Sequence, residues 1–379
     1  MDSLDIAFFG SSLISAYWNG AATYYRGLIR ALARRGHRIA FYEPDAYQRK
    51  EHRDIPDPAW ARSVIYPANT AQEVDRALAG ASNADLIIKC SGVGLWDDYL
   101  ESGVFTIRRP GALVAFLDVD APATLERVHS NPRDPYLALI PRFDYIFTYG
   151  GGDPVINAYR ELGARECVPV YNALDPETHH PVPPEERFRC DLSFLGNRLP
   201  DREARVEEFF LGPASLPGAQ FLLGGNGWAD KALPPNVRWA GHVYTADHNA
   251  FNCSSKAVLN IARDSMARMG FSPATRVFEA AGAGACILTD EWAGIELFLE
   301  PGEEILVVRN GEEVARTLGE LSAERARSIG EAARRRILAG HTYDHRAKLM
   351  ENILSDSRAS TGAARQNTGA TRPDIGAAR

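Results

Sequence analysis

Residues 275–290 form the stretch of this sequence whose side chains are best suited to bind a charged ligand. They predict a short helix that ends at glycine, followed by a buried strand over 286–288. Arg276 and Glu279 are three positions apart, so they share one face near the start of that helix. An arginine in the first turn opposes the helix dipole, and arginine before glutamate is the weaker order for a helical ion pair. We therefore expect an anion at Arg276 and a polar group at Glu279, as a nucleotide diphosphate and its ribose would provide.

The turn after a predicted strand over 192–196 has a similar character. Gly196 lets the backbone approach a phosphate, and Arg198 and Arg202 could supply positive charge. Two surface arginines would give the same pattern without any ligand. Three neighbouring candidates are explained as well by turn chemistry or by a structural hydrogen bond: Asn197, Gly225 and Asn260.

Two aspartates at the end of a predicted strand are candidates for catalysis. Asp118 and Asp120 form an Asp-x-Asp motif. Such a motif can bind a metal, supply a general base to a cleft, or cap the helix expected over 122–127. We favour the base over the metal. His242, which ends the strand predicted over 237–241, is the third catalytic candidate because it points toward the expected cleft.

The other histidines and the cysteines do not predict a metal site. His179 and His180 lie in a polar linker, where we expect solvation. His341 and His345 are four apart, as two ligands on one helical face can be, but a helix cap at Thr342 accounts for them better. The five cysteines are scattered without zinc spacing, as in a reduced cytosolic protein.

A glycine-containing loop joins the first predicted strand, 6–10, to a helix over 21–35. A loop that opens onto a helix N-terminus can bind an anion or a polar ligand. Its spacing differs from the dinucleotide-binding G-x-G-x-x-G pattern, and a plain tight turn explains it equally well. The candidates for the acceptor side of a cleft are Ser11, Ser12, Asn19 and Gly20.

Length and composition describe a two-domain globular protein. The chain has 379 residues, of which 45% are hydrophobic and 24% charged, enough for two cores. A net charge of −7 argues against a general nucleic-acid-binding surface. No apolar run is long enough to cross a bilayer and no signal peptide precedes the first strand, so we predict a cytoplasmic protein without a transmembrane segment. The oligomeric state stays open.

Strand and helix signals alternate along both halves of the chain, which predicts an α/β protein of two Rossmann-like, doubly wound domains that face a cleft. We place the first domain at 1–174, a linker at 175–187, the second domain at 188–356 and a disordered tail at 357–379. Ligands of such sheets bind at the carboxyl ends of the strands. The predicted strands are 6–10, 38–42, 85–90, 113–118, 145–149 and one within 164–174, then 192–196, 220–223, 237–241, 257–261, 285–288 and 305–308.

Five segments of the second half resemble the C-terminal domain of GT-B-fold glycosyltransferases of the group 1 family, most closely the CgeB-like (spore-maturation) subgroup. They recur in that family's order and spacing and cover most of residues 190–350. The first half is similar only in general pattern, as expected for an acceptor domain. The segments are SFLGNRLPDR (193–202), VLNIARDS (258–265), TRVFEAAGAGACILTD (275–290), ELFLEPGEEILVV (296–308) and HTYDHRA (341–347).

The resemblance implies a hexosyltransferase that moves a sugar from a UDP- or GDP-sugar to a hydroxyl of a glycan or small-molecule acceptor, with no required cofactor and no bound metal. Glu279 corresponds to the second glutamate of an E-x7-E pattern that holds the ribose hydroxyls, and Phe271 stands where the first glutamate falls. Arginines would stabilise the leaving diphosphate in place of a metal. The implied donor-binding residues are Gly196, Asn197, Arg198, Arg202, Gly225, Asn260, Arg276, Phe278 and Glu279.

Two other functions stay open at this stage. A sugar-nucleotide 2-epimerase needs several carboxylates and a histidine around the sugar, and the sequence does not show that set. A non-catalytic protein that binds a nucleotide sugar or a glycan could keep the same fold, since a fold does not fix a function. The incomplete glutamate pattern at Phe271 is compatible with such a binding protein.

Overall fold

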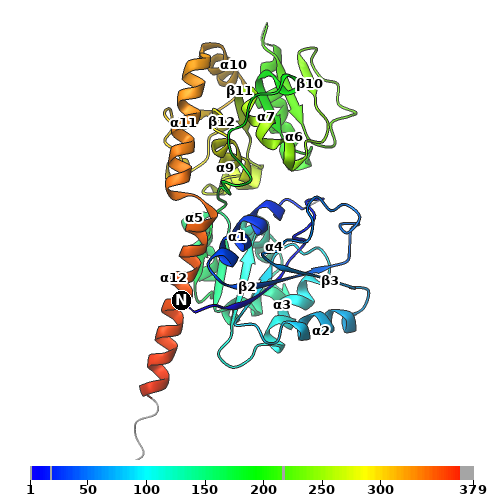
Figure 1. The fold of residues 1–379 in the computed structure, drawn as a ribbon, viewed down its shortest axis with the longest axis vertical. Helices are drawn as coiled ribbons and strands as arrows, with labels where there is room; N and C mark the ends of the chain where they lie inside the picture. Colours follow the sequence, from blue (N-terminus) through cyan, green and yellow to red (C-terminus); the bar gives the residue numbers. More distant parts are fainter. Residues whose placement is uncertain (1, 18, 216–217, 368–379) are drawn as a thin grey trace, which may run out of the picture.

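The structure is a computed structural model that describes residues 2–17, 19–215 and 218–367 (Figure 1). The chain forms two α/β domains, one above the other in Figure 1, and each is built on one sheet. Within the described residues every strand pairs in parallel with its neighbours. Each connection must therefore cross a face of its sheet, and in both domains most crossings contain a helix.

The first sheet has seven strands in the order β3-β2-β1-β4-β5-β6-β7. Strand β1 is third in this order, and its Ile6 pairs with Ile39 of β2 on one side and with Leu86 of β4 on the other. The chain order reverses at this point, and such a switch point opens a crevice at the carboxyl ends of the strands. The strands are β1 (Asp5–Phe9), β2 (Arg38–Pro44), β3 (Arg62–Tyr66), β4 (Leu86–Cys90), β5 (Leu113–Asp118), β6 (Tyr145–Thr148) and β7 (Cys167–Pro169).

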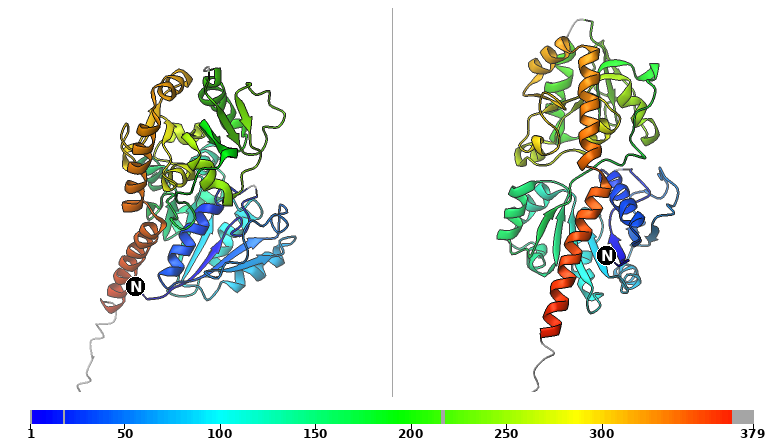
Figure 2. Two further views of the ribbon diagram at one scale, coloured as in Figure 1. Left: turned by 45° about the horizontal axis from the view of Figure 1, so that its top comes forward. Right: turned by 60° about the vertical axis from the view of Figure 1, so that its left-hand side comes forward.

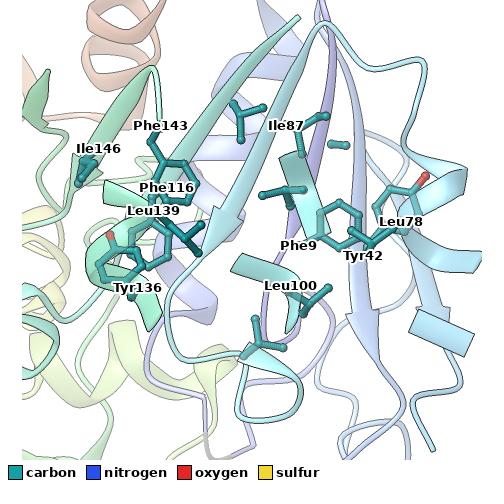
Figure 3. Packing of buried hydrophobic residues seen from close by; sticks show 14 of the residues in the cluster. Phe9, Tyr42, Leu78, Ile87, Leu100, Phe116, Tyr136, Leu139, Phe143 and Ile146 are labelled. Atoms are coloured by element: carbon teal, nitrogen blue, oxygen red, sulfur yellow. The ribbon is translucent and has the colours of Figure 1, made fainter. Parts of the chain in front are cut away.

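Alternate residues of β1 supply an apolar layer to each face of this sheet. Phe8 packs in the layer beneath α1 (Ala22–Arg34), whereas Phe9 stacks on Tyr42 at 4.8 Å in the opposite layer. Figure 3 shows this opposite layer, which continues to Phe116 of β5. Helices cover both faces, so the strands are apolar on both sides. The other helices of this domain are α2 (Ala71–Gly80), α3 (Asp97–Thr106), α4 (Ala121–Ser130) and α5 (Gly152–Glu161), with 3₁₀ turns at Pro135–Ala138 and Ile140–Arg142.

The second sheet has six strands in the order β10-β9-β8-β11-β12-β13. Leu259 of β11 packs in the layer that contains α10 (Gly311–Glu320), and Val258 packs in the layer of α9 (Thr275–Gly282) and α11 (Ala323–Gly340). The strands are β8 (Cys190–Leu195), β9 (Phe221–Gly224), β10 (Val237–Trp239), β11 (Ser255–Asn260), β12 (Ile287–Asp290) and β13 (Leu306–Val308). The remaining helices are α6 (Pro200–Val206), which continues as a π-helix (Glu207–Leu211), α7 (His248–Cys253) and α8 (Asp264–Met269), with 3₁₀ turns at Glu186–Phe188, Pro213–Ser215, Thr245–Asp247 and Ile295–Leu297.

The last helix, α12 (Tyr343–Asn367), returns to the first domain. The outgoing and returning segments lie side by side, since the amide of Leu174 donates to His341 O over 2.9 Å and the amide of Tyr343 donates to Leu174 O over 3.0 Å. Figure 2 shows α12 running along the first domain below α11. The range expected for the second domain, up to 356, therefore includes helical residues whose buried side chains complete the apolar layer of α1: Tyr343, Ala347, Met350 and Leu354.

Two local expectations differ from the structure. Strand β3 was not predicted, because it is a short edge strand in which only Tyr66 is buried. Residues 357–367, expected to be disordered, continue α12, and 368–379 lie outside the described residues. Among the residues that the structure describes, none of the helices combines the length and the apolar character needed to span a bilayer.

Candidate functional site

Two loops at the carboxyl ends of β8 and β9 pack directly on each other. The amide of Gly196 donates to Gly224 O over 2.9 Å, and Trp228 Nε1 donates to Gly196 O over 2.8 Å. Gly225 has a φ of +117°, and a Cβ at that position would lie 2.3 Å from Gly196 O. Only glycine fits there. The structure thus brings the predicted residues Gly196 and Gly225 into one layer of backbone at the edge of the sheet.

Two guanidinium groups lie beside this backbone. A Cβ on Gly196 would be 3.0 Å from Nη2 of Arg202 and 3.2 Å from Nη2 of Arg276. Both guanidinium groups face the ring of Phe194, at 5.6 and 5.0 Å from its centroid. Nη2 of Arg202 also donates to the carbonyl oxygen of Asn197 over 2.5 Å. Two residues predicted from separate motifs therefore concentrate positive charge at one point of the second domain.

Asn260 and strand β8 hold Arg276 in place. Arg276 Nη1 donates to Asn260 Oδ1 over 3.1 Å, and its Nη2 donates to the carbonyl oxygen of Leu195. Asn260 is buried, and its own Nδ2 donates to Thr289 Oγ1 over 3.0 Å. Burial, and secondarily the positive charge of Arg202, lower the pKa of Arg276 to about 9. A bound anion would oppose both effects, because an opposite charge favours the protonated guanidinium.

Two of the expected donor residues have partners inside their own domain. Arg198 donates to Glu203 over 2.7 Å and pairs with Asp230 at 3.0 Å. Phe278 is fully buried, with its ring 5.7 Å from that of Phe298 in the apolar core. These contacts account for Arg198 and Phe278 without a ligand.

Glu279 lies next to two histidines that come from distant parts of the sequence. Its Oε1 is 3.9 Å from His179 Nε2, and His248 at the start of α7 completes the group. The prediction that His179 is solvated is wrong, since its exposure is 2%. Asn249 Nδ2 donates to Thr178 O over 2.9 Å and so holds the linker against the second domain. His180, the next residue, is exposed as predicted.

Asp118 lies inside the first domain. It is fully buried at the end of β5 and accepts hydrogen bonds from Ser91 Oγ and Thr124 Oγ1, both at 2.9 Å, and from the hydroxyl of Tyr159. Burial raises the pKa of its carboxyl group, while these hydrogen bonds oppose the increase. The contacts tie β5 to α4 and α5, which makes Asp118 a support for the strand end that carries Asp120.

Asp120 reaches the other domain. Its Oδ2 lies 2.8 Å from Nη1 of Arg263, which follows β11. Its Oδ1 is buried and has no hydrogen-bond partner among the described residues. A second link between the domains lies close by in the chain, where Asn172 Nδ2 donates to Pro273 O over 3.1 Å. The first catalytic candidate is thus at the interface between the two domains.

Phe271 also belongs to this interface. Its backbone has a φ of +50°, and its carbonyl oxygen accepts a hydrogen bond of 2.7 Å from the amide of Gly151 in the first domain. A Cβ added at Gly152 would lie 2.6 Å from its ring, and one added at Gly294 would lie 2.3 Å away. The position expected for the first glutamate of the E-x7-E pattern therefore holds an aromatic ring packed between glycines of both domains.

The polar side chains of the loop after β1 form hydrogen bonds mainly within the loop. Ser11 Oγ donates to Asn19 Oδ1 over 2.9 Å, and Asn19 Nδ2 donates to Ser12 O over 2.8 Å. Ser12 Oγ donates to Glu43 Oε1 over 3.1 Å, and burial raises the pKa of that glutamate. Gly20 is exposed at the end of the loop. These hydrogen bonds fix the shape of the loop, and they include Glu43, which no sequence motif marked.

His242 lies on the rim of the second domain. Its side chain is exposed, with Nδ1 3.3 Å from Asn226 Nδ2 and its ring 4.5 Å from that of Tyr244. Partial burial is the main cause that lowers the pKa of His242, whereas Asp54 of the first domain raises it. His242 therefore stands apart from Asp120, and the structure does not join the two catalytic candidates by any contact among the described residues.

The residues His341 and His345 do not form a pair of metal ligands. Nδ1 of His345 lies 2.7 Å from Thr342 Oγ1, and Nδ1 of His341 lies 3.1 Å from Arg346 Nη2. Helix α12 begins directly after Thr342, so this residue stands at the expected N-cap position, and its hydroxyl contacts the ring of His345.

Several residues that support the site are not among the predicted site residues, although for some of them the sequence pattern indicated a position near the site. Phe194 lies in a predicted strand and Arg263 follows one, so a position at the carboxyl end of a strand was the available signal. Thr289 follows the strand predicted over 285–288 and had the same signal. His248 had none, because neither a strand end nor a recognisable spacing marks it.

Comparison with known proteins agrees with this geometry. A family described as glycosyl transferase-like matches residues 202–352, the part of the chain that contains Arg276 and Glu279. No curated protein matches the sequence of this chain. Sucrose-phosphate synthase from Thermosynechococcus elongatus has a similar structure, with a TM-score of 0.68 and 14% identity over 94% of this chain and 100% of that chain. The fold is GT-B.

Two further solved GT-B structures carry a nucleotide sugar. Anabaena HepE, in complex with UDP-glucose, has a TM-score of 0.66 and 14% identity over 93% of this chain and 100% of its own. An α-glucosyltransferase in complex with UDP-glucose and DNA containing an abasic site has a TM-score of 0.69 and 14% identity with the same coverage of both chains. The prediction of two Rossmann-like domains in the GT-B arrangement is confirmed. At this level of identity, the shared property is the fold.

Proposed function

We propose that this protein is a glycosyltransferase that moves a sugar from a nucleotide-diphosphate donor to an acceptor hydroxyl. The observation that carries the proposal is the pair of guanidinium groups, from Arg202 and Arg276, beside the backbone of Gly196. The glycosyl transferase-like family match over 202–352 and the GT-B fold support it. The resemblance to the CgeB-like subgroup and a cytoplasmic location are parts of the same proposal.

The arginine pair suits the chemistry of the leaving group. Negative charge grows on the diphosphate as the bond to the sugar breaks, and donors fixed in advance near that charge lower the barrier. Arg276 is fixed by Asn260 and by the carbonyl of Leu195, so little reorganisation is needed when the charge appears. In this proposal the two arginines neutralise the diphosphate, and a metal ion is not required for transfer.

Glu279 is the proposed contact to the ribose. It lies one helical turn after Arg276, on the same face of α9. A carboxylate there can accept hydrogen bonds from both ribose hydroxyls while Arg276 faces the phosphates. Because two proteins of the same fold hold UDP-glucose, we propose a UDP-hexose as the donor, ahead of a GDP-sugar.

The acceptor is proposed to enter from the first domain, past the loop that holds Ser11 and Ser12. Asp120 is the proposed base, since its Oδ1 makes no hydrogen bond with described residues. That oxygen is buried beside Arg263, so the domains must separate before it can meet an acceptor and must close again to exclude water. Glycans and small molecules with a free hydroxyl fit this route.

The test is an assay of nucleotide release. Purified protein is incubated with UDP-glucose, other UDP-hexoses and GDP-sugars, with and without a panel of sugar acceptors, and free UDP or GDP is measured. Release that depends on an acceptor and is lost in Arg276→Ala supports the proposal. Absence of both donor binding and release for every donor would exclude it.

One observation favours a second candidate, a protein that binds nucleotide sugars without turnover. Phe271 fills the position of the glutamate expected at the donor sugar, and its ring packs against Gly152 and Gly294. A site that binds the nucleotide but lacks that carboxylate can hold a nucleotide sugar without transferring the sugar. Donor binding with no release under any acceptor would select this function.

A further inference from the structure

Three side chains that can bind a metal meet beside α9. His179 comes from the linker between the domains, His248 from the first turn of α7, and Glu279 from α9. One ligand atom from each lies within 4.8 Å of the others. His179 is 2% exposed and the Glu279 side chain 13% exposed, so the group is largely withdrawn from water.

Each of the two imidazoles has one buried nitrogen that makes no hydrogen bond with the described residues. His179 Nε2 is buried without a hydrogen-bond partner among the described residues, and Glu279 Oε1, at 3.9 Å, is too far for a hydrogen bond. His248 Nδ1 is also buried without a partner. A buried nitrogen without a hydrogen-bond partner is unfavourable, so two of them beside one carboxylate indicate a missing partner for both.

The orientation of His248 is already that of a ligand. Its Nε2 lies 3.3 Å from the carbonyl oxygen of Val243. A carbonyl oxygen only accepts, so Nε2 carries the proton and Nδ1 keeps its lone pair free. Metal-binding histidines are usually held in this way, with the second nitrogen donating to a carbonyl or a carboxylate.

We propose that His179 Nε2, His248 Nδ1 and the carboxylate of Glu279 bind one divalent transition-metal ion, with Zn²⁺ as the preferred metal. Two imidazoles and one carboxylate are a common zinc ligand set, and they leave the fourth position open. Ligand atoms of a tetrahedral zinc site lie about 3.4 Å apart, so small side-chain rotations bring the three atoms into place.

The neighbouring residues do not compete for this ion. Cys253 Sγ accepts from the amide of Val182 and lies 3.4 Å from Ala283 O, so its sulfur is engaged with backbone. His180 is exposed, and its Nδ1 lies 3.3 Å from the carbonyl oxygen of Pro181. A simple His–Glu ion pair would satisfy one of the two histidines and leave the other without a partner.

The site has a consequence for donor binding, and this consequence rests on the proposed function. Glu279 is the proposed ribose ligand, so a metal ion that takes its carboxylate removes it from the nucleotide. Zn²⁺ and UDP then compete for the same side chain, and zinc acts as an inhibitor. The diphosphate contacts at Arg202 and Arg276 stay unchanged, so competition weakens nucleotide binding without abolishing it.

The first test is a zinc titration of the full-length protein against a chromophoric chelator. We expect one tightly bound Zn²⁺ per chain, and an affinity about tenfold or more lower in His179→Ala and in His248→Ala, because loss of even an outer-shell partner costs about that much. His180→Ala is the matched control and keeps the wild-type affinity. Equal zinc affinity in all four proteins would overturn the proposal.

A second test needs no variant that could fail to fold. The wild-type protein is loaded with Co²⁺, and its visible spectrum is recorded. Ligation by nitrogen and oxygen gives weak ligand-field bands without the intense thiolate charge-transfer band that binding at a cysteine would produce. A thiolate band, or no Co²⁺ complex at all, would contradict the assignment.

UDP binding separates this proposal from the proposed function. With the site as assigned, saturating Zn²⁺ weakens UDP binding to the wild type, and His248→Ala binds UDP but no longer responds to Zn²⁺. Zinc binding that depends on His179 and His248, in a protein that binds no UDP, would leave the metal site standing and remove the transferase proposal. If UDP binds and Zn²⁺ does not change its affinity, the proposal that Zn²⁺ and UDP compete for Glu279 is wrong.

Discussion

Asp120 of the first domain and Arg263 of the second form an ion pair of 2.8 Å between the ends of the two sheets. The two side chains are 30% and 33% exposed, so the pair is in contact with water. Pairs of this kind contribute at most about 1 kcal/mol. The contact can therefore orient the two domains without locking them, as the domain opening in the proposed function requires.

Asp120→Asn should lower turnover by about 10²–10⁴-fold while donor affinity stays near that of the wild type. Loss of a general base costs about that much, and the nucleotide contacts belong to the other domain. Steady-state kinetics with the best donor and acceptor, together with calorimetric binding of UDP, measure both effects.

Arg263→Gln is the matched control for Asp120→Asn, because it removes the ion pair and leaves the carboxylate in place. If Asp120 is the general base, the Arg263→Gln variant should keep most of the wild-type turnover. Equal losses in the two variants would assign the effect to domain pairing, and unchanged turnover in Asp120→Asn would remove the residue from the chemistry.

Arg276→Ala should weaken UDP binding by roughly 1–3 kcal/mol, the value of hydrogen bonds to a charged group. Calorimetric titration with UDP measures the change, and Arg316→Ala, an exposed arginine on α10, is the control that should bind UDP normally. Equal affinity in wild type and Arg276→Ala would show that the diphosphate lies elsewhere.

Glu279→Ala should weaken UDP binding by a similar amount, roughly 1–3 kcal/mol, because the ribose loses its acceptor. Comparison of UDP with 2′,3′-dideoxy-UDP isolates this contact. We expect the wild type to bind UDP more tightly than 2′,3′-dideoxy-UDP. The variant should bind both nucleotides equally, since it has no carboxylate to accept hydrogen bonds from the ribose hydroxyls. A preference for UDP that survives in Glu279→Ala would assign the ribose to another residue.

Glu101 should make the first domain less stable as the pH rises from about 4.5 to 7. Burial raises the pKa of this carboxyl to about 7 in the folded protein from 4.5. Its side chain is 2% exposed, with Oε1 3.8 Å from Arg127 Nη2 and Oε2 without a hydrogen-bond partner among the described residues. Stability is fully present below pH 4.5, where both states are protonated, and about 2–3 kcal/mol is lost once the folded carboxyl also ionises.

The measurement is thermal unfolding of wild type and Glu101→Gln at pH 4.5 and pH 8. The neutral amide avoids the buried charge, so the variant should melt at a higher temperature than the wild type at pH 8, and the two should converge at pH 4.5. Glu320→Gln, at an exposed site on α10, should change neither value. A lower melting temperature for Glu101→Gln at pH 8 would mean that the attraction to Arg127 outweighs burial.

Met350→Ala on α12 should destabilise the first domain by about 2–5 kcal/mol, the cost of a cavity in a packed core. Met350 is fully buried against the layer of α1, whereas its neighbour Leu349 is 37% exposed. Leu349→Ala is therefore the matched control and should have a much smaller effect. Hydrogen exchange of the α1 amides, measured with chemical denaturation, reports the change where it is expected. Similar effects of the two substitutions would show that α12 does not belong to this core.

Local sequence patterns predicted most of the helices and strands, because the formation of a helix or a strand depends largely on residues that are near one another in the sequence. Apolar runs predicted every strand except β3, an edge strand with a single buried residue, since periodicity is a weak signal in a short half-covered strand. The sequence of α12 did not predict that this helix packs on the first domain. An amphipathic helix can pack on either domain, and only the tertiary structure shows which apolar layer it completes.

For the candidate site, the sequence by itself showed that Arg276 is unfavourably placed in the first turn of its helix, and this placement predicts an anion beside it. Only the tertiary structure decided that Arg202 joins it at Gly196, that Asp230 and Glu203 engage Arg198, and that His179 is buried. The physical reason is that helix dipoles and apolar periodicity act between near neighbours. Charge pairing and burial depend on residues far apart in the chain, whose distances are set by packing alone.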